Sequence, residues 1–184
     1  MVRRVFLYLV AFLSLAAPAS LAAQASNQTL QVAPLPRDGE VLISFKLEEP
    51  LTPEIRAAIQ SGLTVQFKYK VELFRSSAAW FDRKISSALV IASVKYDTLQ
   101  RRYHISRAVD GRMEFAETTD KEETAWSTLT RDFARLSLFR GASLEPNAEY
   151  YVKVRANASP RNSSFVWPWQ GDDAVGFAKF TFIR

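Results

Sequence analysis

A long alternating stretch at residues 63–74 limits most strongly how this chain can fold. Apolar residues occupy every second position from Leu63 to Leu73, and most of the residues between them are polar. Because successive side chains of a β-strand point to opposite faces, the pattern predicts a strand with one buried face. Such a strand is longer than usual, so we expect a bend or a bulge along it.

Further strands are indicated by similar alternation or by the turn residues that separate extended segments. Asp97 to Gln100, Asp110-Gly111 and Pro146-Asn147 have the composition of turns. The stretch at 133–139 is apolar without a clear period, and it is compatible with either a strand or the tail of a helix. The segments predicted as strands are 41–47, 63–74, 85–96, 101–109, 148–156 and 174–183.

Two short helices are expected in the connections. Thr52 is a candidate N-cap, Pro53 suits the first helical position, and Gly62 is typical of a residue that follows a helix, so we predict a helix over 53–61. The run from Thr118 to Glu123 has the composition of a capping box with acids in the first turn. It predicts a second helix of about three turns.

Six or seven antiparallel strands with two connecting helices favour a mainly β protein, an antiparallel β-sandwich of immunoglobulin-like size. A small β-barrel is the alternative. We expect a single sandwich domain over residues 39–184, preceded by a flexible lead-in at 26–38, where Pro34 and Pro36 interrupt any regular period.

The N-terminus has the order of a secretory signal. Arg3 and Arg4 precede an apolar run at 5–15, and small residues follow up to Ala25. The run is shorter than the roughly 20 residues that a membrane-spanning helix needs. We therefore predict a signal peptide over 1–25, cleaved near Ala23 to Ala25, and a periplasmic or secreted product. The general secretory and twin-arginine routes both remain open.

The composition excludes several kinds of site. The chain has no cysteine and one histidine, which excludes disulfides, thiolate metal sites and multi-histidine zinc centres. The net charge of +5 includes Arg3 and Arg4, and without them it is +3. Acids and bases alternate along the rest of the chain, so no clustered basic run indicates a nucleic-acid partner.

Several stretches together resemble a family of uncharacterised exported bacterial proteins, domain of unknown function 4390. The resemblance implies an extracytoplasmic, strand-rich domain, and it implies no catalytic residues. The residues that carry it are Gly62 to Arg75, Trp80-Phe81-Asp82, Tyr96 to Leu99 running into Arg101-Arg102-Tyr103, Tyr150 to Arg155, and Trp167-Pro168-Trp169.

Candidate catalytic groups are few. His104 lies between Tyr103 and Ile105 on an expected strand, so it faces away from both, and no nucleophile motif accompanies it. Adjacent acids, such as Asp172-Asp173, diverge in an extended chain, whereas glycosidase carboxylates must face one another. We expect no catalytic residue, metal or cofactor. A carboxylate-dependent envelope hydrolase, with or without the help of His104, is the alternative function.

Aromatic residues in loops are the candidate binding residues. Trp167 and Trp169 flank a proline, and Trp80-Phe81-Asp82 lies at another turn. These side chains would either contact a partner or plug the end of the sandwich. The sequence favours an exported, non-catalytic binding module whose partner is an envelope protein or polymer. Contact with a membrane is expected only through an uncleaved signal segment.

Overall fold

The computed structural model describes residues 29–37, 40–48, 50–77, 81–139, 144–160 and 174–183. The predicted signal peptide lies outside these residues. No helix in these ranges is long and apolar enough to cross a bilayer. The elements in chain order are β1 (Thr29–Arg37), β2 (Glu40–Glu48), α1 (Pro53–Gln60), β3 (Val65–Arg75), β4 (Arg83–Asp97), β5 (Arg102–Val109), β6 (Arg112–Thr119), α2 (Glu122–Thr130), β7 (Phe133–Ser137), β8 (Glu149–Pro160) and β9 (Ala174–Thr181).

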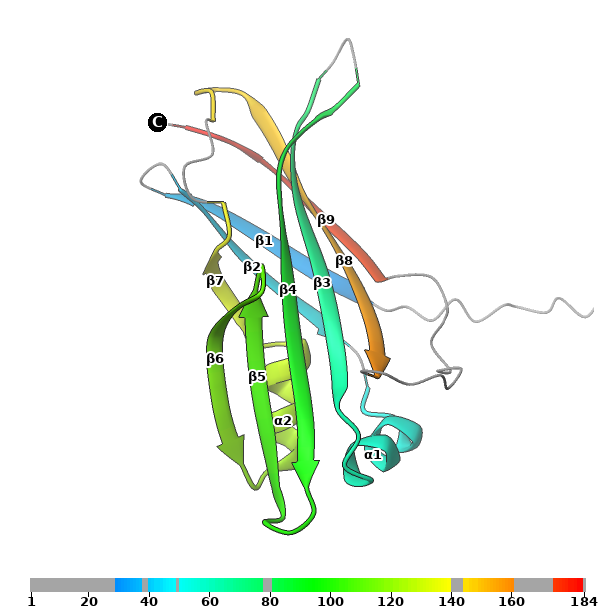
Figure 1. The fold of residues 1–184 in the computed structure, drawn as a ribbon. Coiled ribbons are helices and arrows are strands. Elements are labelled where there is room, and N and C mark those ends of the chain that lie inside the picture. The colour runs from blue at the N-terminus through cyan, green and yellow to red at the C-terminus, as the bar shows by residue number, and fades with distance from the viewer. Residues whose placement is uncertain are drawn as a thin grey trace, which may run out of the picture.

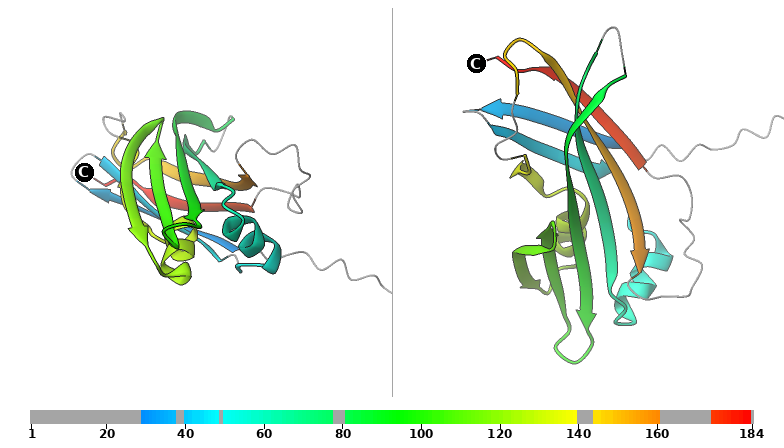
Figure 2. Two further views of the ribbon diagram at one scale, coloured as in Figure 1. Left: turned by 60° about the horizontal axis from the view of Figure 1, so that its bottom comes forward. Right: turned by 45° about the horizontal axis from the view of Figure 1, so that its top comes forward.

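The strands form two antiparallel sheets. The larger sheet has the order β6-β5-β4-β3-β8-β9, and the smaller one has the order β1-β2-β7. In Figure 1, β1 and β2 cross behind the larger sheet, and α2 lies behind β4 and β5. The views in Figure 2 show the same layering. The prediction of a mainly β sandwich is confirmed. The larger sheet exceeds either sheet of an immunoglobulin domain, because the meander from β3 to β6 stays within it.

Strand β3 lies inside the larger sheet, and its alternation has the predicted effect. Its inward residues are buried, namely Val65, Phe67, Tyr69, Val71 and Leu73. The pairing of β3 with β4 shifts register between Leu73 and Phe74, which is the irregularity expected of so long a strand. Leu63 is exposed and precedes the strand, so the alternating pattern in the sequence begins two residues before the strand does.

The core is built from aromatic rings contributed by both layers. Phe45 of β2 stacks on Phe133 of β7 with ring centroids 4.4 Å apart, and Tyr69 of β3 lies 4.7 Å from Phe133. On α2, Trp126 meets Phe67 edge to face at 5.5 Å. The inner face of the larger sheet is therefore covered partly by the smaller sheet and partly by α2.

Helix α1 begins at Pro53 as predicted and ends at Gln60, one residue before the predicted end. The Thr52 hydroxyl accepts a hydrogen bond from the Ile55 N–H at 3.5 Å, and Gly62 follows the helix with φ +83°. Helix α2 forms where expected, but the capping box does not. Its N-cap is Lys121, without a side-chain cap, and the Thr119 hydroxyl accepts from the Lys121 N–H instead. Thr119 is the last residue of β6, so it is too early in the chain to cap the helix.

The prediction of a flexible lead-in at 26–38 is wrong for Thr29–Arg37, which forms β1. This strand is at the edge of its sheet and pairs with β2 only. Pro34 and Pro36 are tolerated there because an edge strand has N–H groups that need no partner in the sheet. The prolines do not end the strand, and they face the same side of it as buried Leu30.

Strand β6 was not predicted either, and together β1 and β6 raise the total to nine strands in the described residues instead of six or seven. Its residues are mostly exposed, so it has no apolar alternation to detect. The turn before it was predicted: Asp110 and Gly111 have φ +48° and +82°, as a tight hairpin turn requires. The undecided stretch at 133–139 contains a strand, β7.

Candidate binding surface

The tip of the β3–β4 hairpin places one candidate residue fully in solvent. Phe81 is 98% exposed. Its neighbour Asp82 is held by two hydrogen bonds: Oδ1 accepts from the Ser77 N–H at 3.1 Å, and Oδ2 accepts from the Tyr151 hydroxyl at 3.0 Å. Trp80 lies outside the described residues. The two described members of Trp80-Phe81-Asp82 thus differ in role, since Asp82 closes the hairpin and Phe81 projects from it.

The base of this tip is braced from β8. The rings of Phe74 and Tyr151 stack with centroids 4.9 Å apart and planes 7° apart. Burial raises the pKa of the Tyr151 phenol, and its hydrogen bond to the Asp82 carboxylate raises that pKa further. Tyr151 therefore stays protonated and remains a donor at neutral pH. These contacts hold the hairpin in place below Phe81.

Trp167 and Trp169 lie outside the described residues, as do Asp172 and Asp173. Whether the two tryptophans contact a partner or plug the sandwich stays a prediction.

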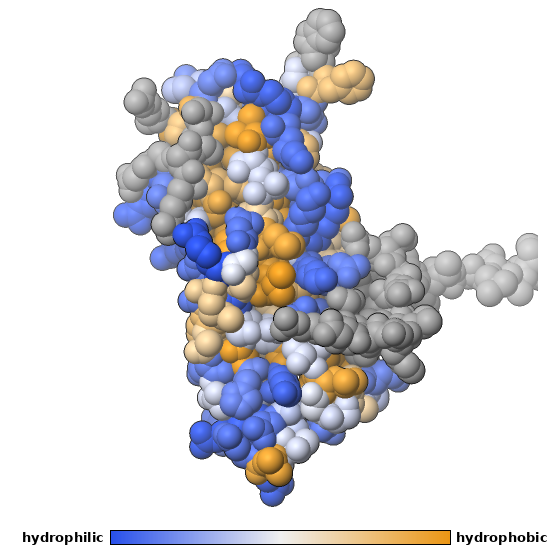
Figure 3. Space-filling model, viewed as in Figure 1, coloured by the Kyte–Doolittle hydropathy of each residue, from blue (hydrophilic) through white to orange (hydrophobic). Residues whose placement is uncertain are grey.

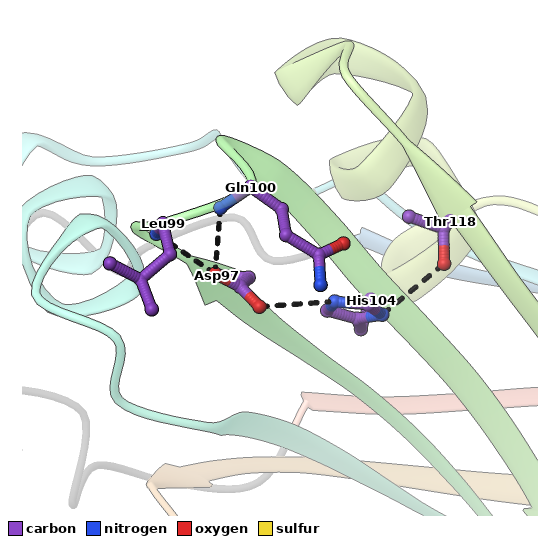
Figure 4. A network of polar contacts seen from close by, with 5 residues as sticks. All are labelled: Asp97, Leu99, Gln100, His104 and Thr118. Carbon is purple, nitrogen blue, oxygen red and sulfur yellow. Dashed lines mark hydrogen bonds and ion pairs between the residues drawn. The ribbon is translucent and has the colours of Figure 1, made fainter.

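His104 lies on the outward face of β5, as predicted, in a small polar network (Figure 4). Its Nδ1 is 3.2 Å from the Thr118 hydroxyl, and its Nε2 is 3.8 Å from Oδ2 of Asp97. A cavity of about 460 Å³ lies beside it, lined in part by Ser93, Lys95 and Ser106. The serine hydroxyls bond one another at 2.7 Å.

This network has the residue types of a hydrolase but not the geometry. The contact of 3.8 Å between His104 and Asp97 is too long for the hydrogen bond that orients a catalytic imidazole. Strand β5 is paired on both sides, with β4 and with β6, so its backbone N–H groups near His104 are used in the ladders and are not free to stabilise an oxyanion. We interpret the His104 network as a cross-strand surface cluster.

Asp97 instead serves the turn between β4 and β5. Its Oδ1 accepts hydrogen bonds from the Gln100 and Leu99 N–H groups, both at 2.9 Å (Figure 4). The bond from the Gln100 N–H is the main cause that lowers the pKa of the Asp97 carboxyl, and the bond from Leu99 adds to it. The group therefore stabilises the fold above the pKa of an unfolded aspartate, about 3.9, and this contribution is lost as the pH falls through the lower pKa of the folded state.

We expect Asp97→Asn to reduce the loss of thermal stability that accompanies a fall in pH from 6 to 2. At pH 6 the wild-type chain melts at a higher temperature than the variant, because only the carboxylate gains charge-assisted bonds from Leu99 and Gln100. At pH 2 the two melting temperatures converge. Thermal unfolding from pH 6 to pH 2 measures this difference, and a constant gap across that range would contradict the assignment.

Other acidic residues are used in separate ion pairs. Glu122 accepts from Nε of Arg56 with both oxygens at 3.0 Å, which joins the N-terminus of α2 to α1. Glu48 pairs with Lys46 and with Arg131. In the described ranges no group of three or more histidine, aspartate or glutamate side chains is placed to hold a metal ion.

Glu72 is the residue that sequence reasoning missed. It lies on the outward face of β3, as the alternation indicates, yet only 4% of it is exposed. Three cations surround its carboxylate, at 3.3 Å for Lys70, 3.7 Å for Lys84 and 3.6 Å for Arg155. Lys84 and Arg155 come from β4 and β8, so no local pattern around Glu72 could have indicated the cluster.

The comparisons with known proteins agree with the expected resemblance. A family model described as domain of unknown function (DUF4390) matches residues 22–162. The chain belongs to this family. The match takes in every element of this DUF4390 protein from β1 to β8, and β9 lies beyond it. No curated protein and no solved structure matches the chain.

Proposed function

We propose that this DUF4390 protein is an exported, non-catalytic binding module of the cell envelope that contacts its partner through the tip of the β3–β4 hairpin. The observation that carries the proposal is Phe81, a large apolar side chain that is 98% exposed on a braced support. The order of Arg3, Arg4 and the apolar run after them supports export. The partner is an envelope protein or polymer.

The hairpin has the physical properties of a contact element. It extends past the ends of β5 and β6 in Figure 1. The pairing of β4 with β5 begins at Val90, so the part of β4 nearer the tip, starting at Arg83, lies beyond that ladder. A partner there would bury Phe81 without disturbing the core, and a buried aromatic anchor commonly supplies much of the affinity of an interface. Trp167 and Trp169 stay candidates for the same contact.

Replacing Phe81 with serine is expected to abolish partner binding while leaving the fold intact. The free energy of unfolding should change by less than about 0.5 kcal/mol, because an exposed side chain loses no packing. Photo-crosslinking in cells with the reactive group at position 81 should give an adduct. A reactive group at a neighbouring position should also give an adduct, and Phe81→Ser in that chain should remove it. Denaturant unfolding measures stability.

The matched control is Leu99, which is 94% exposed in the turn at the opposite end of β4. A crosslinker at position 99 should give no adduct, and Leu99→Ser should bind like wild type. If positions 81 and 99 give equal amounts of adduct, crosslinking reflects exposure alone and the hairpin tip is rejected as the contact. Export is tested separately by cell fractionation and by the mass of the product, which should begin at residues 23–26.

The alternative of a carboxylate hydrolase gains no support from the described residues. Glu48 and Glu122 are paired with cations, and the nearest acid to His104 serves a turn. Carboxylates that act on a glycosidic bond must face each other across a substrate. We therefore propose a binding function alone.

A further inference from the structure

The outer face of the larger sheet is strongly basic over β3, β8, β9 and the adjoining part of β4. Directly paired residues share a face, so the registers place one set of charged residues together. Six of these residues are cations and two are carboxylates: Lys68, Lys70, Lys84, Lys153, Arg155 and Lys179, with Glu72 and Glu149. The face therefore has a local positive charge far denser than the chain as a whole.

Glu72 organises the middle of this face without neutralising it. One carboxylate is shared among Lys70, Lys84 and Arg155, so the four groups together keep a charge of +2. The cationic side chains remain 39% to 52% exposed while Glu72 is buried beneath them. The positive charges are thus directed to solvent, which favours an anion outside the sheet.

Exposed apolar side chains on the same face indicate that its binding partner is not a simple polyanion. Leu89, Val175 and Phe177 are 39%, 47% and 70% exposed, and the last two pair directly with Arg155 and Lys153. Figure 3 shows an apolar patch in the middle of this face bordered by hydrophilic side chains. Lysine and arginine interspersed with exposed apolar groups suit the interface of an anionic bilayer, where both kinds of group are satisfied.

We propose that the outer face of the larger sheet docks on an anionic lipid surface. The charge of the face complements lipid phosphates, while Phe177, Val175 and Leu89 enter the boundary between headgroups and acyl chains. This surface differs from the tip of the hairpin, and the proposal goes beyond the partner contact made by Phe81. It requires no retained signal segment.

The test uses vesicle sedimentation of the chain starting at Ser26, which contains every described helix and strand. Vesicles of phosphatidylcholine alone are compared with vesicles that also contain phosphatidylglycerol, at 0.1 M salt. We expect binding to the anionic vesicles only, weakened at 0.5 M salt. Equal binding to both compositions, or binding to neither, would overturn the proposal.

Two charge reversals locate the surface. Lys68→Glu with Lys179→Glu leaves in place the three cations that contact Glu72, and neither residue pairs directly with Glu72, so the fold should be retained. Each cation near an anionic surface contributes about fivefold in affinity, so we expect the pair of reversals to weaken binding at least about 25-fold. The control with the same change in net charge is Lys46→Glu with Lys121→Glu, away from this face, and it should bind nearly as wild type.

The remaining outcomes separate the lipid from other occupants and this surface from the hairpin. Phe177→Ser should weaken binding to anionic vesicles, and Phe81→Ser should not. If the chain binds soluble polyglutamate but no vesicle, the face recognises an acidic polymer and the lipid proposal is wrong. If Phe81→Ser releases the vesicles while the reversals at Lys68 and Lys179 do not, the membrane contact belongs to the hairpin.

Discussion

Replacing Phe133 with alanine is expected to lower the free energy of unfolding by about 4 kcal/mol, as removal of a buried phenyl ring does. Phe133 is 1% exposed and lies between the two sheets. Its ring is 4.4 Å from Phe45 of the smaller sheet and 4.7 Å from Tyr69 of the larger one. The substitution would therefore leave a cavity at the junction of the layers, where neither sheet can move in to fill it.

Denaturant unfolding followed by circular dichroism measures this loss. The matched control is Phe177→Ala, because Phe177 is 70% exposed and its removal leaves no cavity. Its cost should stay within about 0.5 kcal/mol. If the two phenylalanines cost the same, Phe133 does not join the two layers as described.

Replacing Gly176 with alanine is expected to cost about 3 kcal/mol, although alanine is a small residue. A Cβ at this position would lie 2.2 Å from the carbonyl oxygen of Leu30 and 2.9 Å from Cγ2 of Val32. The first of these is a backbone atom of β1 and cannot rotate away. The absence of a side chain at Gly176 is what allows β1 to approach β9 so closely.

A second substitution tests this account of Gly176. Val32→Ala removes the side-chain contact but not the Leu30 oxygen, so the double variant should recover little of the lost stability. Gly111→Ala is the control, because nothing lies within 4 Å of the added Cβ and the cost comes from its φ of +82° alone. Rescue by Val32→Ala would show that the backbone contact is not the cause.

Local sequence patterns predicted the parts of the fold that depend on residues close together in the chain. The alternation in β3 shows which of its faces is buried, and Thr52 and Gly62 mark the bounds of α1. The prediction for β1 failed because a proline breaks a strand only where its missing N–H is needed, and that depends on whether the strand is at an edge. Strand β6 was missed because an exposed edge strand buries no alternating face.

The candidate site was predicted only in part, for a related reason. The sequence indicated an aromatic turn at Phe81 and Asp82, but not that Asp82 is bonded to Tyr151 of β8 while Phe81 stands free. The cluster of Glu72 and its cations was not predicted for the same reason, because Arg155 follows Glu72 by more than eighty residues. Contacts across strands depend on register, which no single segment encodes.

By itself, the sequence determined the mainly β class, the inward face of β3, both helices and most of the turns. These follow from side-chain periodicity and from the backbone preferences of proline, glycine and capping residues, which act over a few positions. Only the tertiary structure decided which strands are edges, how closely β1 crosses Gly176 and which cations surround Glu72. Those features arise when segments distant in sequence pack together, because burial and charge then depend on neighbours that the local sequence does not specify.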